Sequence, residues 1–478
     1  MASLTDRDID AIARRIAAAM GAVPAPAARP EPPAGDPAMG IFASVAEAVE
    51  AAGRAQPRFV AMPLKQRARV LAAVRETMLT QAEALAEAAW KETGLGRVDD
   101  KAVKNRLVTE RTPGLEHLYP HAVTGDHGLS LIEPAPFGVI GAITPITNPT
   151  STIICNAIGM LAAGNAVLFN VHPGARRCSM QTVALINKTI VEAGGPPNVV
   201  TCLSNPSIET AQETMRHPAI RLVVVTGGGA VVRAAMASGK RAICAGPGNP
   251  PVVVDETAHI DKAGRDIVLG ASCDNNIICT DEKEVLVVAS VADRLLAAMA
   301  ANGAMLIERS RLPQLENLLF TRLHGPRKEA EINRELIGKD ADVILGRMGL
   351  TVPPGTRLGI VEVDESHPLL WTEQMMPILP ICRVPSADYG IDLAVQVEGG
   401  HRHTAVMHSM NLDHLSRMAK ECDCSIFVKN GRSQAGLGLD GEGYCSFTIA
   451  SPTGEGLTGP RSFSRWRRCV LVDHFRIT

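Results

Sequence analysis

Two cysteines, Cys273 and Cys279, stand beside a polar trio in the run GASCDNNIICTDEKEV at residues 270–285. A cysteine attacks a carbonyl carbon only as the thiolate, and the intermediate that follows needs hydrogen-bond donors for its oxyanion. The backbone N–H of Cys279 and a side-chain amide such as that of Asn148 are donors of this kind. Because most cysteines are inert core residues, the run by itself indicates a nucleophile only in a fitting context.

Asn148 lies in the run FGVIGAITPITNPTSTIICNAIG, where an expected strand leads through a turn into a helix. Pro145 and Pro149 fix the backbone on both sides of the amide, which suits a donor that must be held still. An equally good interpretation is that Asn148 simply caps the helix with its side chain. The residues alone leave both open.

A glycine-rich turn follows the expected buried strand of the run RLVVVTGGGAVVRAAMASG. Its residues are Thr226, Gly227, Gly228 and Gly229, directly before a helix. Backbone N–H groups at a helix start can bind a pyrophosphate, and glycines let it come close. The pattern is not GxGxxG, so an unliganded turn remains as good an interpretation.

The histidines of GGHRHTAVMHS do not predict a metal site. His401 and His403 have a spacing that metal ligands use, but no carboxylate or cysteine accompanies them. We therefore expect no metal ion. Cys422 and Cys424 are interpreted as packing residues rather than a redox pair, and Cys273 as a thiol open to oxidation.

Short apolar strands alternate with helices from about residue 120 onward, which predicts an α/β fold with parallel sheets covered on both faces. We expect a cofactor-binding domain at 41–245, a catalytic α/β domain at 246–430, and a return to the first domain with a C-terminal arm at 431–478. Residues 120–134 are expected to contribute to the same arm. The apolar run CVLVDHF would be an aggregation hazard if unpaired, which favours an oligomer.

The first forty residues have a different character. Residues 1–20 place Leu4, Ile9, Ile12, Ile16 and Met20 at helical spacing, which predicts an amphipathic helix. Residues 21–40 are rich in proline and alanine and predict an extended linker. We interpret the helix as a tethered docking peptide; a first helix of the globular fold is the alternative.

Composition excludes several classes of function. The 478 residues carry a net charge of −2, so no basic field for nucleic acid is expected. No run of 18 apolar residues occurs, which argues against a membrane span. The 11 cysteines have no CxxC pairs, and no secretory leader is visible, which indicates reduced thiols in a bacterial cytoplasm.

Taken together, these motifs resemble the aldehyde dehydrogenase superfamily over nearly all of residues 41–478, and most closely the CoA-acylating enzymes of bacterial microcompartments. The motifs that carry the resemblance are ITPITNPTST, LAAGNAVLFNVHPGARR, VVTGGGAVVRAAMASGKRAICAGPGNPPVVVD, ASCDNNIICTDEKEV, EQMMPILP, HTAVMHS and SFTIASPTGEG. The resemblance implies an aldehyde dehydrogenase fold with a Rossmann-like cofactor domain, a catalytic domain and an oligomerisation arm.

The resemblance also implies roles for residues. Cys279 takes the place of the nucleophile and Asn148 that of the oxyanion donor. Contacts to NAD are implied for the following residues: Thr144, Pro145, Ile146, His172, Pro173, Thr226, Gly227, Gly228, Gly229 and Glu373. Glu373 takes the place of the carboxylate at the nicotinamide ribose. His172 and Pro173 replace a lysine that many members direct to the adenosine ribose, so a preference for NAD over NADP stays open.

One departure from the superfamily predicts the type of reaction. Hydrolytic members activate water with a glutamate in an ELGGK-like segment, whereas the corresponding stretch here is CAGPGNPP. Without a positioned base, attack by water loses a factor of about 10² to 10⁴, so the thiol of coenzyme A becomes the better nucleophile. We therefore expect a Cys279 thioester, a ping-pong cycle and acyl-CoA as product, from propionaldehyde first and acetaldehyde second. A non-acylating enzyme that makes free acid is the alternative, and a silent cargo protein is a more distant one.

By the same resemblance, residues 1–20 look like an encapsulation peptide that binds a shell protein. The chain is then expected inside a bacterial microcompartment, as a homodimer or homotetramer.

Overall fold

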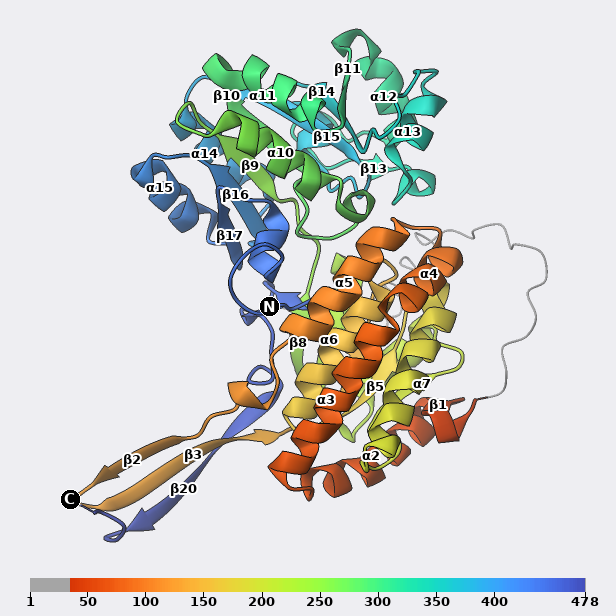
Figure 1. Ribbon diagram of the computed structural model, residues 1–478, viewed down its shortest axis with the longest axis vertical. Coiled ribbons are helices and arrows are strands. Elements are labelled where there is room, and N and C mark those ends of the chain that lie inside the picture. Colours follow the sequence, from red (N-terminus) through yellow and green to blue (C-terminus); the bar gives the residue numbers. More distant parts are fainter. Residues whose placement is uncertain (1–34, 478) are drawn as a thin grey trace.

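The computed structural model describes residues 35–477, and its core is built on two parallel sheets (Figure 1). The first sheet has six strands in the order β1-β6-β5-β4-β7-β8. Their bounds are β1 (Ile41–Phe42), β4 (Val139–Ile143), β5 (Ala166–Asn170), β6 (Val200–Leu203), β7 (Ile220–Thr226) and β8 (Arg241–Ala245). From β4 the chain adds β5 and β6 on one side and then returns to add β7 and β8 on the other. The order therefore reverses between β4 and β7, and ligands of open α/β sheets bind at such a point.

Alanine-rich helices cover the first sheet. They are α2 (Val45–Val60), α3 (Leu64–Thr80), α4 (Ala82–Thr93), α5 (Val98–Arg111), α6 (Pro149–Ala162), α7 (Arg176–Glu192), α8 (Ile208–Arg216) and α9 (Gly229–Met236). Figure 1 shows α3, α5, α6 and α7 lying together over the sheet. Every residue of α6 is buried, as expected for a helix between a sheet and an outer helical layer. The strands are apolar on both faces for the same reason.

The second sheet has seven parallel strands in the order β11-β14-β15-β10-β9-β16-β17. They are β9 (Pro251–Val254), β10 (Glu284–Val288), β11 (Ala304–Ile307), β14 (Leu358–Glu362), β15 (Ile378–Val384), β16 (Thr404–His408) and β17 (Ile426–Lys429). Its helices are α10 (Ile260–Ala271), α11 (Ala289–Ala301), α12 (Leu312–Leu319), α13 (Ala341–Arg347), α14 (Ala387–Val397) and α15 (Leu412–Cys422). The connection from α10 to β10 contains the short helix η4 (Cys273–Asn276) and Cys279. The functional residues thus lie on a loop that two regular elements hold.

A three-stranded antiparallel arm projects from this body (Figure 1). Its strands are β2 (His121–Gly125), β3 (Gly128–Pro136) and β20 (Ser464–Val472), with β3 in the middle. Val123, Val470 and Val472 are exposed on it. The arm therefore presents apolar side chains and two unpaired edges to its surroundings.

Part of the N-terminal prediction falls outside the described residues: the helix at 1–20 and the linker up to residue 34. From residue 36 the chain is folded. The Asp36 side chain accepts from the Ala38 N–H and caps the short helix η1 (Pro37–Met39), and β1 then pairs with β6. Within residues 35–477, no helix combines the length and apolar character that crossing a membrane requires.

Asn165 joins β4, α6 and the arm at the end of the sheet far from the turn with Asn148. Its Oδ1 accepts from the backbone N–H groups of Phe137 and Gly138, at 2.7 and 3.1 Å. Its Nδ2 donates to the carbonyls of Met160 and Phe463, at 3.3 and 2.9 Å. The side chain is fully buried, so these four backbone groups depend on it.

Asn165→Ala is expected to destabilise the protein by about 2–4 kcal/mol, because buried N–H and C=O groups lose their partners. Thermal unfolding at equal protein concentration measures the change. Asn302→Ala is the matched control, since Asn302 also donates to a carbonyl but is exposed at the end of α11. Equal melting temperatures for the two variants would contradict the prediction.

Candidate active site

Cys279 lies on the α10–β10 connection, half-buried, after three consecutive residues with left-handed backbone. Asp274, Asn275 and Asn276 have φ of 45°, 57° and 64°. Aspartate and asparagine tolerate this conformation better than other residues with a side chain. Their side chains also bind the backbone: Asn275 Nδ2 donates to the Gly338 carbonyl, and Asn276 Nδ2 to those of Ala271 and Glu282, each at 2.8–2.9 Å. The polar trio seen in the sequence thus shapes the loop.

Lys283 secures the same loop from inside. Its ammonium group is fully buried and donates to the Asn276 backbone carbonyl and Oδ1, both at 2.7 Å, and to the Ile278 carbonyl at 3.3 Å. It is a positive charge four residues after Cys279. It therefore fixes the backbone that precedes the thiol and acts on the thiol electrostatically.

The pKa of the Cys279 thiol is raised to about 12. Burial is the main cause, the Glu373 carboxylate adds to it, and Lys283 opposes it. The nucleophile is therefore mostly a neutral thiol when the site is empty. A bound positive charge or exclusion of Glu373 from the thiol would favour the thiolate.

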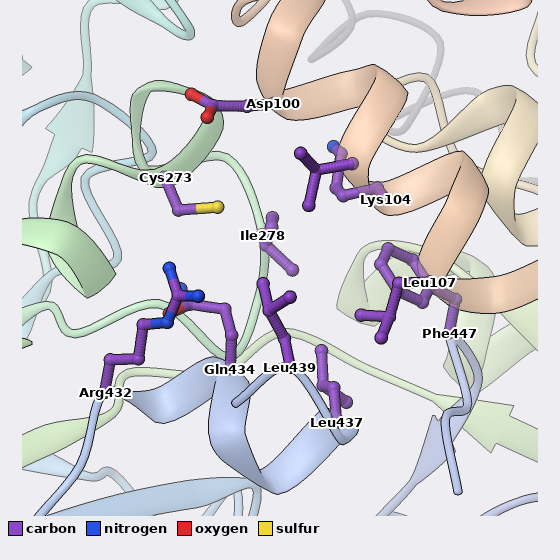
Figure 2. Close-up of a pocket in the computed structure, with 11 residues that line it drawn as sticks. Asp100, Lys104, Leu107, Cys273, Ile278, Arg432, Gln434, Leu437, Leu439 and Phe447 are labelled. Carbon is purple, nitrogen blue, oxygen red and sulfur yellow. The ribbon is translucent and has the colours of Figure 1, made fainter. Parts of the chain in front are cut away.

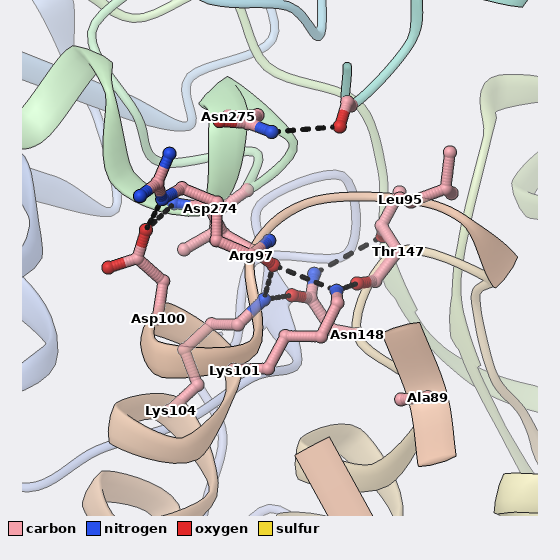
Figure 3. Close-up of polar contacts among 12 residues, drawn as sticks. Ala89, Leu95, Arg97, Asp100, Lys101, Lys104, Thr147, Asn148, Asp274 and Asn275 are labelled. Carbon is pink, nitrogen blue, oxygen red and sulfur yellow. Dashed lines mark hydrogen bonds and ion pairs between the residues drawn. The ribbon is translucent and has the colours of Figure 1, made fainter. Parts of the chain in front are cut away.

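Asn148 occupies the N-cap position of α6, but its side chain makes no cap hydrogen bond. The helix-cap interpretation of this residue is therefore wrong. Instead its Oδ1 accepts from Lys104 Nζ at 2.5 Å, and its Nδ2 donates to Thr147 Oγ1 at 3.2 Å (Figure 3). Asn148 itself is buried. The amide is held for a purpose other than capping.

Lys104 belongs to a buried charge cluster, defined here as Lys101, Lys104 and Asp274. Both lysines come from α5 and form ion pairs with Asp274 Oδ2 of η4, Lys101 at 3.0 Å (Figure 3). Burial alone would raise the pKa of the Asp274 carboxyl, but the two ammonium groups lower it below its ordinary value. Burial lowers the pKa of Lys101 to about 8, against the attraction of Asp274. The cluster joins the helical layer of the first sheet to the loop of the second.

The stretch CAGPGNPP connects β8 to β9 and passes directly against the nucleophile loop. A Cβ atom at Gly248 would lie 2.8 Å from the Cys279 carbonyl oxygen and 2.9 Å from His403 Cγ. A larger residue at this point would therefore push the two domains apart. Asn249, the next residue, is buried and donates to the Leu370 and Val397 carbonyls, at 3.1 and 2.9 Å.

His403 borders the same place and was not predicted as a site residue. Burial lowers its pKa to about 3, so the imidazole is neutral. Its Nδ1 pairs with Thr404 Oγ1 at 2.8 Å, and its buried Nε2 has no partner among residues 35–477. An unpartnered acceptor next to a nucleophile loop is a signal that only the three-dimensional structure provides.

The predicted cofactor residues gather at the carboxyl ends of neighbouring strands. Thr144, Pro145 and Ile146 follow β4, and His172 and Pro173 follow β5, which pairs with β4. His172 Nδ1 accepts from the Gly174 N–H at 3.0 Å, and a Cβ at Gly174 would meet Ile146 Cδ1 at 2.7 Å. The two turns thus contact each other.

The glycine turn follows β7, on the other side of β4. Thr226 Oγ1 is 2.8 Å from Thr448 Oγ1, Gly227 donates to the Ala245 carbonyl at 3.1 Å, and Gly228 is the N-cap of α9. A Cβ at Gly228 would meet nothing within 4 Å, so this point faces open space. The first-turn N–H groups of α9 have no acceptor within the helix. The turn fits a phosphate at the sheet's reversal point.

Glu373 reaches the site from the loop before β15. Its neighbour Gln374 donates through Nε2 to the Lys283 carbonyl at 3.0 Å and to the Leu369 carbonyl at 2.7 Å. Burial raises the pKa of Glu373, and Lys283 opposes this. The structure therefore brings Glu373, Cys279 and Asn148 to one place, with the β4, β5 and β7 turns along the sheet edge.

A cavity of about 260 Å³ opens beside the nucleophile loop (Figure 2). Its walls come from α5, the nucleophile loop and the segment after β17. They consist of Asp100, Val103, Lys104, Leu107, Cys273, Ile278, Arg432, Gln434, Leu437, Leu439 and Phe447. Figure 2 shows Leu107, Leu437, Leu439 and Phe447 at one end and Asp100 and Arg432 toward the other. Burial raises the pKa of Cys273 well above its ordinary value, which argues against the easy oxidation expected for it.

The two layered sheets, the thiol with its amide and the glycine turn define a nucleotide-dependent enzyme of covalent catalysis. The chain belongs to the aldehyde dehydrogenase family, whose profile matches residues 33–439. This confirms the family and the fold expected from the sequence.

Among its relatives, the acetylating acetaldehyde dehydrogenase EutE of Salmonella typhimurium is 51% identical over 92% of this chain and 94% of its own. The propionaldehyde dehydrogenase of Rhodopseudomonas palustris, solved with bound CoA and an acylated cysteine, is 48% identical. It covers 91% of this chain and 98% of its own, with a TM-score of 0.88.

Two further structures match equally well. A propionaldehyde dehydrogenase from the fucose utilisation microcompartment of Clostridium phytofermentans is 46% identical, covers 92% and 100% of the two chains, and gives a TM-score of 0.89. An engineered glycolyl-CoA reductase with bound NADP⁺ is 48% identical, covers 93% and 100%, and gives 0.89.

The raised pKa of Cys279 leads to a test. Without cofactor, the rate of alkylation of Cys279 by iodoacetamide should rise about tenfold per pH unit from about pH 7 to 10, because only the thiolate reacts. Glu373→Gln should speed alkylation at each pH, since the carboxylate raises the thiol pKa. Peptide mass spectrometry follows Cys279, with the exposed Cys469 as internal control. A rate that levels off near neutral pH would show that the thiolate is already formed.

Proposed function

We propose that this chain oxidises a short aldehyde to its acyl-CoA, with propionaldehyde as main substrate, NAD⁺ as oxidant and Cys279 as nucleophile. The observation that carries the proposal is the half-buried Cys279 in one site with the uncapped Asn148 amide, beside a CAGPGNPP segment without any carboxylate. The acylated cysteine and CoA of the Rhodopseudomonas enzyme support it.

The first half of the reaction builds the acyl-enzyme. Cys279 Sγ loses its proton and forms a bond to the aldehyde carbon, and the carbonyl oxygen becomes an oxyanion. The Asn148 amide and the Cys279 backbone N–H donate to that oxygen, which stabilises the intermediate. NAD⁺, when bound, supplies the hydride acceptor. Departure of the hydride from the former aldehyde carbon leaves a thioester on Cys279.

The cofactor fits the crevice at the carboxyl ends of β4, β5 and β7. The Thr226–Gly229 turn would hold the pyrophosphate, the turns at Thr144–Ile146 and His172–Pro173 would line the crevice, and Glu373 would hold the nicotinamide ribose. Open space at Gly228 and the free N–H groups of α9 support this assignment. The preference for NAD⁺ over NADP⁺ is checked by comparing kcat/KM for the two, since the engineered reductase holds NADP⁺.

The second half of the reaction transfers the acyl group. The CoA thiol attacks the thioester carbon, the bond from that carbon to Cys279 Sγ breaks, and acyl-CoA leaves. Water is a poor competitor because the segment from Cys244 to Pro251 contributes no general base and packs with Gly248 against the Cys279 carbonyl. The same feature disfavours the alternative enzyme that releases free acid.

We assign the aldehyde's carbon chain to the cavity of Figure 2, because Ile278 lies next to the nucleophile and Lys104 contacts Asn148. The leucines and Phe447 would pack against that chain. Acetaldehyde is the second candidate substrate, favoured by the 51% identity to the Salmonella enzyme. One methylene in an apolar pocket changes discrimination by about 1–3 kcal/mol, so kcat/KM for the two aldehydes separates them clearly.

The first test is NADH formation from propionaldehyde with and without CoA. With CoA we expect steady turnover; without CoA we expect at most one NADH per site, because the thioester persists. Cys279→Ala should form no NADH in either case. Steady turnover of the wild type without CoA would mean that water is activated in this site and that free acid is the product.

We also propose a place and an assembly for the enzyme. Residues 1–20 would bind a microcompartment shell protein in a bacterial cytoplasm, as supported by the microcompartment origin of the Clostridium relative. The exposed apolar side chains of the arm would be covered in a homodimer or homotetramer, which light scattering checks. Residues 41–245 with 431–478 would form the cofactor unit and 246–430 the catalytic unit.

Deletion of residues 2–20 should leave kcat with propionaldehyde and CoA within about twofold, because the described site lies entirely beyond residue 90. The same deletion should abolish co-sedimentation with assembled shells when both are expressed together. A deletion variant that still sediments with shells would place the docking segment elsewhere.

A further inference from the structure

The contact between Lys104 and Asn148 constrains which end of the amide faces the substrate. Lys104 Nζ lies 2.5 Å from Asn148 Oδ1, and both side chains are buried. An ammonium group only donates hydrogen bonds, so the oxygen end of the amide must face it. The NH₂ end then points away from Lys104. One of its N–H groups is used by Thr147 Oγ1 at 3.2 Å, which leaves the other for a further acceptor.

Nothing else fixes the orientation of this amide. The side chain makes no cap bond to α6, which would have held its oxygen against the helix N–H groups. Among the described residues, Lys104 and Thr147 are the hydrogen-bond partners of the Asn148 side chain. Without Lys104 the amide could turn over and present its oxygen to a developing negative charge.

Lys104 is in turn held by Asp274, whose carboxylate is fixed from several sides. Asp274 accepts from Lys101 at 3.0 Å and from the Arg97 N–H at 2.6 Å, as well as from Lys104. The close approach requires glycine at position 96: its φ is +71°, and a Cβ there would lie 2.0 Å from Asp274 Oδ1. The backbone of η4 thus sets the position of the lysine.

The cluster also has a favourable charge. Two ammonium groups and one carboxylate leave one positive charge in excess, buried next to the amide. A fixed positive charge in a site that excludes water stabilises negative charge that develops during the reaction.

We propose that Lys104 is a positioning residue: it turns the Asn148 amide so that its N–H faces the oxyanion, and Asp274 holds Lys104 in place. This rests on the proposed role of Asn148 as oxyanion donor. A purely structural ion pair between α5 and η4 is the competing explanation, and the experiment has to separate the two.

The experiment is a double-mutant cycle on the full-length chain. The single-turnover rate of NADH formation from propionaldehyde without CoA is measured for the wild type, Lys104→Met, Asn148→Ala and the double variant. Asn148→Ala should slow acylation by about 10²- to 10³-fold. Lys104→Met should slow it at least about tenfold in the wild type but less than about twofold once Asn148 is gone, because it acts through that amide.

Three further measurements guard the conclusion. NADH binding, followed by its fluorescence, should change less than about twofold in Lys104→Met, since the lysine does not contact the cofactor turns. Lys101→Met keeps the Lys104–Asn148 contact and should slow acylation less than Lys104→Met. Asn165→Ala, at the opposite end of β4 and α6, controls for loss of stability and should retain the rate per folded molecule.

The outcomes are distinct. The same slowing by Lys104→Met in both backgrounds would show a merely structural role and overturn the proposal. A wild-type rate for Asn148→Ala would instead refute the proposed function of Asn148, and this proposal with it. If Lys104→Met does not fold, Lys104→Gln is used, because glutamine can bind the amide in either orientation; a wild-type rate for that variant would overturn the proposal too.

Discussion

The structure depends on a cluster of charges buried where its two units meet. Lys101 and Lys104 extend from α5, which covers the first sheet, and Asp274 belongs to the loop that leads into β10 of the second. Removing such charges from water costs several kcal/mol per ion, so the cluster is stable only when all three partners are in register. Neither sheet can satisfy these groups alone. The nucleophile and the amide therefore acquire their relative positions only when the two units are docked.

Around this junction, close backbone packing takes the place of side chains. Gly96 lets Asp274 approach α5, and Gly248 lets the β8–β9 connection pass against the Cys279 carbonyl. In both places a side chain would separate elements that must touch. A site packed in this way has little room for an ordered water near the acyl carbon, which is consistent with transfer to a thiol rather than to water.

The sequence predicted the parts of the structure that rest on local patterns. The strands of NAVLFN and RLVVVTGG, the helix after Pro149 and the glycine turn all lie where hydrophobic periodicity and turn residues indicated. Parallel strands with apolar residues on both faces leave few alternatives, so the fold class followed from the alternation of elements.

What the sequence did not predict depends on contacts between distant segments. Lys104 and Asp274 are 170 positions apart, and nothing in either segment marks the partner. Asn148 could be interpreted as a cap or as a donor until Lys104 was seen to hold its oxygen. The trio from Asp274 to Asn276 was noticed as polar, but its left-handed backbone became evident only in the structure. His403 likewise has an ordinary sequence context and an unusual burial.

The arm has a consequence for how the chain is made. Its middle strand, β3, pairs on one side with β2, three residues earlier in the sequence, and on the other with β20, which follows both sheets. During synthesis β3 thus leaves the ribosome with a partner on one edge, while the other stays open until residues 464–472 emerge. Domains fold in the order in which they are made, and an unpaired strand edge invites wrong partners. Assembly through the arm is therefore a late event, delayed until the sheets that carry the site have been translated.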